Sequence, residues 1–146
     1  MKVFIQNEAA SKEKNIHNEK TLEYKKTIIV SRPYPYPYGF ILDTTSGDGE
    51  NVDCFVMTKQ RLIIGQIVDC QPIGLIEVID NGKEDHKILS IMNGETAQII
   101  SEVKEKLTDF INHVFDHAEG KIVVAGRFLG KKEAIEYINR CMDDHV

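Results

Sequence analysis

The chain is poor in the residues that cross-link or anchor small proteins. Among its 146 residues there are three cysteines, four prolines and no tryptophan. The cysteines, Cys54, Cys70 and Cys141, are far apart and form no C-x-x-C pair, so the sequence indicates neither a disulfide framework nor a zinc site. Cys54 and Cys70 fall inside apolar runs, and we expect both thiols to pack in the core.

Long apolar runs and long basic runs are also missing. No window approaches the roughly 18 apolar residues of a membrane-spanning helix, and the apolar part of residues 1–6 is too short for a signal peptide. No run of lysine or arginine is long enough to form a phosphate-binding surface, and the net charge of -5 argues against a nucleic-acid partner. We therefore expect a cytoplasmic protein that contacts neither membranes nor nucleic acid.

The composition is that of an ordinary globular domain. Hydrophobic residues make up 42% and charged residues 28% of the chain, which excludes the disordered, collagenous and coiled-coil classes. Domains most often contain about 100 to 150 residues. We therefore expect residues 1–146 to form a single domain with one core.

Short β-branched and apolar segments, separated by turn residues, dominate the chain before residue 92. The expected strands cover residues 2–6, 27–30, 54–57, 66–79, 86–91 and 121–125. Pro72, inside one of these runs, indicates a sheet edge or a bulge. Many short strands and few helices favour a closed or nearly closed barrel. Residues 7–26 are polar and without period, and we expect a solvated loop or an irregular hairpin there.

Two helices are expected near the C-terminus. Within residues 96–117, apolar residues recur at spacings of three and four from Ile99 to Val114, which is typical of a helix with one apolar face. Thr96 is expected to cap its N-terminus. A shorter helix is expected over residues 131–142. The sequence thus predicts an α+β fold, with a small five-stranded OB-like β-barrel, additional short strands, and one long and one shorter C-terminal helix packed against it.

The most informative stretch is an acidic loop. Asp48, Glu50 and Asp53 lie within six residues, and Gly47 and Gly49 beside them allow the backbone to turn and bring the carboxylates together. Mg²⁺ prefers oxygen ligands in octahedral geometry and is usually held by one or two carboxylates plus substrate phosphates. The loop therefore predicts a site for a hard divalent cation.

A second acidic loop runs from Asp80 to Asp85. Its Asn81-Gly82 pair is a strong signal for a tight turn, which would fold both aspartates back to the same end of the barrel. Lys87 lies two residues after Asp85, so on a strand their side chains point to the same face. A lysine there can balance the carboxylate charge or meet a phosphate oxygen. Together the two acidic loops predict a site for several divalent cations.

Two other metal-binding patterns are weaker. His113 and His117 are four residues apart on the expected helix, but no third ligand lies nearby in the sequence. Because Mg²⁺ does not favour imidazole, we expect these histidines to have a helix-surface or packing role. A calcium site of the EF-hand type is not expected either, because the first acidic loop lacks the twelve-residue spacing and is flanked by strands.

Three motifs occur together in this chain. They are Tyr-Pro-x-x-Tyr-Gly-Phe at residues 34–40, Asp-Gly-x-x-x-Asp at residues 48–53 and Asp-x-x-x-x-Asp-x-Lys at residues 80–87. In this combination the sequence resembles the soluble, metal-dependent inorganic pyrophosphatases of the β-barrel type. The resemblance implies hydrolysis of inorganic pyrophosphate to two phosphates by a metal-activated water, with Mg²⁺ as cofactor and Mn²⁺ as a possible substitute. It also implies a homo-oligomer, commonly a hexamer.

The same resemblance implies roles for individual residues. The metal-binding carboxylates would be Asp48, Asp53, Asp80 and Asp85. Glu50 would orient or deprotonate the attacking water, and Tyr38 would donate to a substrate phosphate, so both are catalytic candidates. Phosphate binding would fall to Lys14, Lys26, Tyr38 and Lys87.

The chain departs from the family pattern at three of the positions that bear on the site. Gln6 stands where the family has a glutamate on the metal side, and Glu8 is the nearest substitute. Lys26 stands where the family has a phosphate-binding arginine, and lysine lacks the planar fork that grips a phosphate through two oxygens. Glu50 stands where the family has an aspartate, which moves the carboxylate by one methylene.

A fourth departure follows His117, where the family has a Tyr-Lys pair that holds phosphate and this chain does not. Lys121 or Arg127 could replace part of those contacts. Pyrophosphate as the true substrate therefore stays open, as do the number of metals and the rate. The alternatives are hydrolysis of another phosphoanhydride or phosphate ester on the same metal site, and a non-catalytic protein that binds metal or phosphate.

Overall fold

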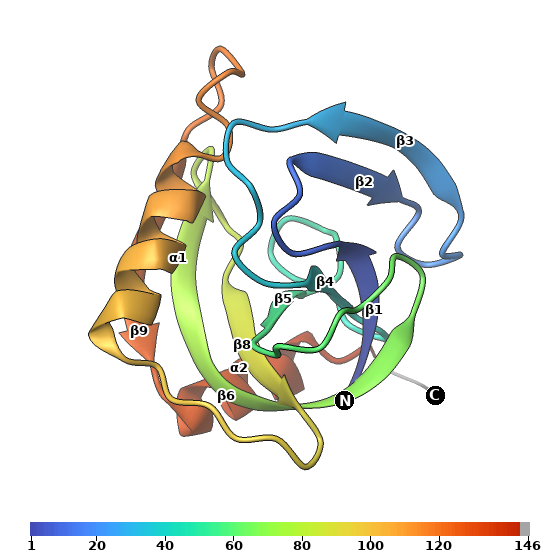
Figure 1. Ribbon diagram of the computed structural model, residues 1–146, viewed down its shortest axis with the longest axis vertical. Coiled ribbons are helices and arrows are strands. Elements are labelled where there is room, and N and C mark those ends of the chain that lie inside the picture. Colours follow the sequence, from blue (N-terminus) through green and yellow to red (C-terminus); the bar gives the residue numbers. More distant parts are fainter. Residues whose placement is uncertain (144–146) are drawn as a thin grey trace.

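The structure, a computed structural model, describes residues 1–143 and places strands before and between two helices (Figure 1). The strands are β1 (Lys2–Asn7), β2 (Glu13–His17), β3 (Tyr24–Ile29), β4 (Tyr38–Ile41), β5 (Asp53–Val56), β6 (Ile67–Asp80), β7 (Lys83–Glu84), β8 (Lys87–Met92) and β9 (Val123–Leu129). The helices are α1 (Ser101–His113), which precedes β9, and α2 (Lys131–Cys141).

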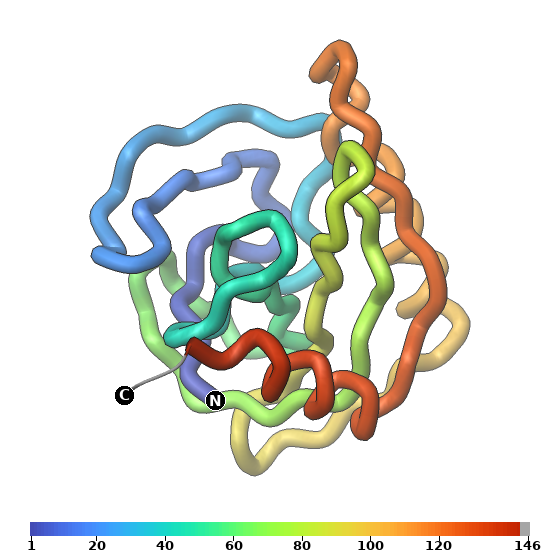
Figure 2. The backbone as a smooth tube through the Cα atoms, turned by 180° about the vertical axis from the view of Figure 1, so that it is seen from behind, coloured from blue at the N-terminus to red at the C-terminus, as the bar shows by residue number. Residues whose placement is uncertain are grey.

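Five of the strands close into a barrel. β1 pairs with β4, β4 with β5, β5 with β8 and β8 with β6, and the pairing of β6 with β1 completes the ring. Figure 2 shows this ring from behind, with α2 lying across it. β9 adds to the free side of β6, and α1 lies alongside β6 and β9 in Figure 1. The predicted α+β fold, a small five-stranded barrel with two helices packed against it, is confirmed.

β6 bends at the proline that interrupts its apolar run. The register against β8 shifts between Pro72 and Gly74, which is the mark of a β-bulge. Gly74 is needed at this point, because a Cβ there would lie 2.5 Å from Cδ1 of Ile99 and 3.0 Å from the carbonyl oxygen of Leu129. The bend lets the start of β6 pair with β1 and its end pair with β9. Of the two possibilities expected for Pro72, the bulge is correct.

β5 and β8 run parallel, and their register places Asp53 opposite Lys87. Each strand begins shortly after an acidic segment: β5 follows the loop at residues 46–52, and β8 follows the segment at residues 80–85, which includes β7. Because the two strands are parallel neighbours, their first residues lie at the same end of the barrel. The topology therefore brings both acidic segments to one place.

β2 and β3 form a separate two-stranded ribbon that arches over this end of the barrel (Figure 1). Asn15 ties the ribbon to β1: its backbone N–H donates to Oδ1 of Asn7 at 2.7 Å, and its side-chain amide donates to the carbonyl oxygen of Gln6 at 3.0 Å. The hairpin reading of residues 7–26 is therefore correct. Polar rather than apolar side chains are buried under the ribbon, which is why the segment shows no hydrophobic period.

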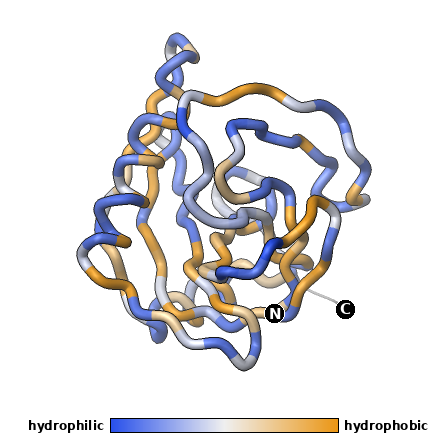
Figure 3. Tube along the Cα trace, viewed as in Figure 1, coloured by the Kyte–Doolittle hydropathy of each residue, from blue (hydrophilic) through white to orange (hydrophobic). Residues whose placement is uncertain are grey.

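The apolar core has two parts. One fills the barrel and continues to α2, and it contains Cys54, Cys70 and Tyr137. The other lies between the barrel and α1, and it contains Phe55 and Leu107. Figure 3 shows apolar residues concentrated along the barrel strands and alternating with polar residues along α1. The expectation that Cys54 and Cys70 pack in the core is confirmed, and both thiols are free.

α1 is shorter than the predicted helix over residues 96–117. It begins at Ser101, no side chain caps its N-terminus, and the prediction of Thr96 as the N-cap is wrong. The chain before Ser101 is not helical, and Ile99 packs at the bulge of β6 instead of on a helix face. Within residues 1–143, no helix combines the length and the apolar character needed to cross a membrane.

Candidate active site

A cavity of about 390 Å³ opens where β5 and β8 begin. Its walls come from the β2–β3 ribbon, the two acidic segments, and the end of α1 with the chain that follows it. Eight of the residues predicted for the site line this cavity: Lys14, Tyr38, Asp48, Glu50, Asp53, Asp80, Asp85 and Lys87. The fold thus gathers candidate residues from five separate strands and two loops.

Lys26, the ninth candidate, is not among the residues that line the cavity. It lies on β3 opposite Ile16 and is exposed. Ile28, two residues further along the same strand, lies opposite Lys14 and lines the cavity instead. The register of the ribbon therefore puts an apolar side chain where a second cation was predicted, and the position of Lys26 does not support its predicted role.

The centre of the cavity is an ammonium group held between two carboxylates. Nζ of Lys87 lies 2.5 Å from Oδ2 of Asp53 and 2.7 Å from Oδ2 of Asp85. Asp53 comes from the neighbouring parallel strand, and Asp85 comes from the position two residues before Lys87. All three side chains are largely buried. Buried ions need such pairing, because each would otherwise carry an uncompensated desolvation cost.

The three groups shift one another's pKa. Burial would raise the pKa of Asp53, but the charge and the hydrogen bond of Lys87 outweigh it and hold that pKa below its ordinary value. Burial raises the pKa of Asp85 to about 7, with Lys87 opposing the shift and Asp53 adding to it. Burial would lower the pKa of Lys87, yet the surrounding acidic groups raise it well above its ordinary value. Lys87 is thus held as a cation with Asp53 as its counterion, while burial disfavours the charged form of Asp85.

The first acidic loop is held in shape by Asp48. Its Oδ1 accepts hydrogen bonds from the hydroxyl of Ser46 at 2.6 Å and from the backbone N–H of Glu50 at 2.9 Å. Gly49, between them, has a φ of 86°, a conformation that favours glycine. The hydrogen bonds that Asp48 accepts therefore stabilise the turn from which both Asp48 and Glu50 face the cavity.

The second acidic turn lies against the first. A Cβ on Gly47 would lie 3.1 Å from the backbone oxygen of Glu84, so the absence of a side chain at this position lets the two segments approach closely. Asp80, at the end of β6, forms an ion pair with Nζ of Lys121 at 2.9 Å. Asp80 also pairs across the sheet with Val123, which lines the cavity beside it. The predicted convergence of the two acidic segments is therefore seen in the fold.

Two lysines on the opposite wall share one aromatic ring. Nζ of Lys121 lies 4.9 Å and Nζ of Lys14 lies 5.6 Å from the ring centre of Phe115. Such cation–π contacts stabilise an ammonium group without neutralising it. Burial lowers the pKa of Lys14, and the charge of Asp53 opposes that shift. The cavity thus has two further cations besides Lys87, and one of them, Lys121, is paired with Asp80.

The comparisons with known proteins agree on one family. The family model for inorganic pyrophosphatase matches residues 2–145. An inorganic pyrophosphatase of Nanoarchaeum equitans is 31% identical over 153 residues, covering 97% of this chain and 95% of its own. The chain belongs to the inorganic pyrophosphatase family. Another member, from Thermoplasma volcanium, is 32% identical over 124 residues, covering 77% of this chain and 73% of its own.

Solved structures from the family share the fold. An inorganic pyrophosphatase from Neisseria gonorrhoeae superposes with a TM-score of 0.88 at 23% identity, covering 97% of this chain and 88% of its own. The inorganic pyrophosphatase from Thermus thermophilus gives a TM-score of 0.87 at 22% identity with the same coverage. The barrel and its helices are therefore those of the family, although most of the sequence differs.

One carboxylate in this family member's cavity was not anticipated from its sequence. Glu19 lines the cavity and accepts a hydrogen bond at Oε1 from the backbone N–H of Asn51 at 3.0 Å. Burial, followed by the charges of Asp53 and Glu50, raises the pKa of Glu19 to about 8. No motif marks this residue, because it lies in the polar segment of the ribbon and reaches the cavity only through the fold.

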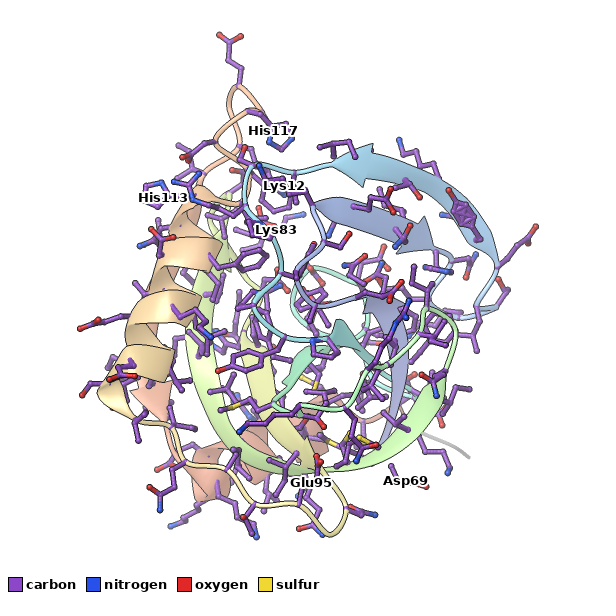
Figure 4. The ribbon with its side chains drawn as sticks, in the orientation of Figure 1. Lys12, Asp69, Lys83, Glu95, His113 and His117 are labelled. Atoms are coloured by element: carbon purple, nitrogen blue, oxygen red, sulfur yellow. The ribbon has the colours of Figure 1, made fainter. Side chains whose placement is uncertain are left out.

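The two histidines at the end of α1 differ in their surroundings. His113 lies on the helix surface, where its Nδ1 is 2.9 Å from Oδ2 of Asp116, in line with the expectation (Figure 4). His117 lies beyond the helix and lines the cavity. Its backbone N–H donates to Oγ of Ser31 at 3.0 Å, and its Nδ1 lies 2.7 Å from the same hydroxyl. His117 therefore fastens the wall after α1 to the end of the ribbon.

The oxygen-rich side of the cavity suits a hard divalent cation. Oδ1 of Asp85 is buried and has no hydrogen-bond partner within residues 1–143, although the residue lines the cavity. As placed, no three His, Cys, Asp or Glu side chains in that part of the chain converge closely enough to hold a metal ion. The carboxylates share one cavity without forming a closed shell, so side-chain rotation would have to complete any coordination.

Proposed function

We propose that this protein hydrolyses inorganic pyrophosphate to two phosphates and requires Mg²⁺, for which Mn²⁺ can substitute. The observation that carries the proposal is the buried arrangement of Lys87 between Asp53 and Asp85, in a cavity that also receives Asp48 and Asp80. Membership of the inorganic pyrophosphatase family supports the choice of substrate.

The proposed metal ligands are Asp48, Asp53, Asp80 and Asp85. Their carboxylate oxygens are the donors that Mg²⁺ prefers, and the unpartnered Oδ1 of Asp85 is a buried acceptor that lacks a donor or a cation. Bound ions would neutralise the substrate phosphates and lower the pKa of a coordinated water. Lys87 would then be free to turn from the carboxylates toward an arriving phosphate oxygen.

Glu50 is the proposed base. It is exposed on the acidic loop and faces the cavity, so it can accept a proton from the attacking water. A bond forms between the water oxygen and one phosphorus, and the bond from that phosphorus to the bridging oxygen breaks. The bridging oxygen leaves with the second phosphate and carries the bonding electron pair.

The opposite wall is proposed to hold the phosphates. Lys14 and Lys121 provide ammonium donors there. Tyr38 is buried in the cavity wall, and burial raises its pKa well above its ordinary value, so its hydroxyl stays protonated and can donate to a phosphate oxygen. Besides metal ions, phosphoryl transfer requires cationic groups and hydrogen-bond donors that the protein holds in position. Lys121, which has an ion pair with Asp80, supplies a contact that Lys26 cannot supply from its place on the ribbon.

The direct test is a phosphate-release assay on the purified protein. Pyrophosphate should be hydrolysed in Mg²⁺, hydrolysis should stop in EDTA, and Asp53→Asn should abolish it. Glu84→Gln, a change at an exposed carboxylate of the second acidic turn, is the matched control and should retain activity. Absence of Mg²⁺-dependent phosphate release from pyrophosphate would contradict the proposal.

A second candidate substrate class is a phosphoanhydride with an organic group. It is favoured by the half-buried apolar side chains of Ile28, Phe115 and Val123, which line the cavity beside the lysines. The same assay on tripolyphosphate and nucleoside diphosphates decides between the two. Faster release from a nucleoside diphosphate than from pyrophosphate would favour the second class, and Mn²⁺ binding with no turnover of any substrate would indicate a non-catalytic binding protein.

We also propose that the protein assembles as a homo-oligomer, a hexamer by the family resemblance. Ile79 and Val124 face each other across β6 and β9, and both are exposed together with Ile122. This apolar surface supports burial against another copy. Light scattering after size exclusion should give a multiple of the 16.6 kDa chain mass, reduced by Ile79→Lys, and a monomeric mass for the unmodified protein would contradict the proposal.

A further inference from the structure

Glu19 is placed at the acidic cavity by backbone contacts. It follows β2, and its Oε1 accepts the backbone N–H of Asn51, which lies within the first acidic loop, at 3.0 Å. The next residue, Lys20, donates to the carbonyl oxygen of Thr44 at 2.9 Å and to Oγ1 of Thr45 at 3.2 Å. The turn of the ribbon is thus fastened to both sides of the loop. The position of the Glu19 carboxylate is therefore fixed before any ligand arrives.

The hydrogen bond to Asn51 uses one of the two carboxylate oxygens of Glu19. The residue lines the same cavity as Asp48 and Asp53, and within residues 1–143 it forms no ion pair. Lys87, the most buried cation of the cavity, is already shared by Asp53 and Asp85. The second oxygen of Glu19 therefore lacks a positive partner in a site crowded with negative charge.

The electrostatics show how closely Glu19 shares this environment. After burial, the largest contributions that raise its pKa come from Asp53 and Glu50, and they exceed the opposing effect of Lys14. Like charges held this close need a cation among them if all are to ionise. A divalent cation satisfies that need more fully than a single ammonium group, and it accepts several oxygen ligands at once.

We propose that Glu19 is a further carboxylate ligand of the divalent-cation site, binding the cation through Oε2 while Oε1 stays on the amide of Asn51. This inference rests on the proposed metal site. A second observation at the same cavity points to a cation: Oδ1 of Asp85 is buried and unpartnered. The ribbon would thus contribute both a carboxylate to the metal and Lys14 to the phosphate, from its two ends.

The test is Mn²⁺ binding to the full chain, followed by calorimetry and by the electron paramagnetic resonance signal of free Mn²⁺. Glu19→Gln keeps an oxygen for the amide of Asn51 and removes the charge, so the loop stays fastened. Mn²⁺ affinity should fall by about 10-fold or more, as it does when residues that support a metal site are changed. Glu23→Gln, at an exposed glutamate of the same ribbon turn, should bind as the unmodified protein does.

Two further variants separate a ligand from a residue that only positions the loop. Glu19→Ala should weaken binding beyond Glu19→Gln, because it also removes the bond to Asn51. Glu19→Asp, which keeps the charge on a shorter side chain, should recover part of the affinity. A single cooperative urea unfolding transition in EDTA verifies that each variant folds. Unchanged Mn²⁺ affinity in Glu19→Gln overturns the inference even if Glu19→Ala binds weakly.

The same titration distinguishes failure of this inference from failure of the proposed function. If the unmodified protein and Glu19→Gln bind Mn²⁺ equally while Asp53→Asn does not bind it, the proposed metal site is supported and Glu19 is not one of its ligands. If the unmodified protein binds no Mn²⁺ at millimolar concentration, the metal site and the inference both fail.

Discussion

Lys87 and Asp53 lie 34 positions apart in the sequence and 2.5 Å apart in the fold, as an ion pair across the parallel strands β5 and β8. Lys87 also holds Asp85 at 2.7 Å. Both carboxylates are among the proposed metal ligands. In the metal-free protein, Lys87 therefore neutralises two carboxylates that bound cations would otherwise neutralise. The stability of the protein and its affinity for metal are coupled through this lysine.

Removing this ammonium group should destabilise the metal-free protein. Lys87→Met leaves two carboxylates buried without a counterion, and breaking a buried pair in this way costs about 3–5 kcal/mol. We expect a matching drop in the free energy of unfolding in urea with EDTA, and a smaller drop in Mg²⁺. Lys83→Met, at an exposed lysine labelled in Figure 4, is the control and should change stability by less than about 0.5 kcal/mol. Equal urea midpoints for Lys87→Met and Lys83→Met in EDTA would refute the stabilising role of Lys87.

The two lysines of the ribbon should behave differently. Lys14→Met removes a donor that lines the cavity, and a hydrogen bond to a charged group is worth about 1.5–3 kcal/mol, so KM for pyrophosphate should rise about 10-fold or more. Lys26→Met should leave kcat and KM unchanged, because this side chain lies outside the cavity lining. Steady-state kinetics at saturating Mg²⁺ measure both. A larger effect from Lys26→Met than from Lys14→Met would show that the ribbon register is wrong.

Shortening the proposed base should slow the reaction. Glu50 extends from a loop whose shape is set by the bonds that Asp48 accepts, so Glu50→Asp withdraws the carboxylate by one methylene without moving the backbone. A displacement of about 1 Å at a reacting group can cost up to about 100-fold, and we expect kcat to fall about 10-fold with KM nearly unchanged. Glu50→Gln should be slower still. A rise in kcat for Glu50→Asp would mean that the site is not adapted to glutamate, and no change would mean that Glu50 is not the base.

Stability of the metal-free protein should fall as pH rises, and Glu19 is one cause. Its pKa is raised from 4.5 to about 8 in the folded protein, so between those values the folded state holds a proton that the unfolded state releases. Its contribution to stability is complete below about pH 4.5 and is lost as pH rises through about 8. In EDTA, the decline between pH 5 and 8 should be smaller in Glu19→Gln by on the order of 2 kcal/mol. The stability of Glu23→Gln should decline with pH as that of the unmodified protein does. Parallel curves of stability against pH for the unmodified protein, Glu19→Gln and Glu23→Gln would contradict the raised pKa of Glu19.

The sequence identified the chemistry of the site better than its geometry. Asp85 and Lys87 were placed on one face by the period of a strand, and the structure has them in contact. The contact of Lys87 with Asp53 could not be derived in the same way, because it depends on β5 and β8 becoming parallel neighbours. Strand order is a property of the whole barrel, and no local spacing encodes it.

Local sequence did not show where Ile99 and Lys26 lie in the fold. Ile99 fits the apolar phase of α1, but it packs at the bulge of β6, and the helix begins only at Ser101. Lys26 matched a family position by counting back from Tyr34, yet the register of the ribbon places Ile28 in the cavity instead. The packing of Ile99 and the strand register around Lys26 both depend on the folded structure, and the local sequence predicted neither.

Manganese in a crystal is the most direct measurement of the central claim, which is that Asp48, Asp53, Asp80 and Asp85 surround divalent cations in one cavity. Crystals grown with MnCl₂ and phosphate should show anomalous difference peaks within coordinating distance of these four carboxylates, with Lys87 turned toward the phosphate. Crystals with phosphate but no anomalous peak in the cavity, or with the manganese bound elsewhere, would contradict it.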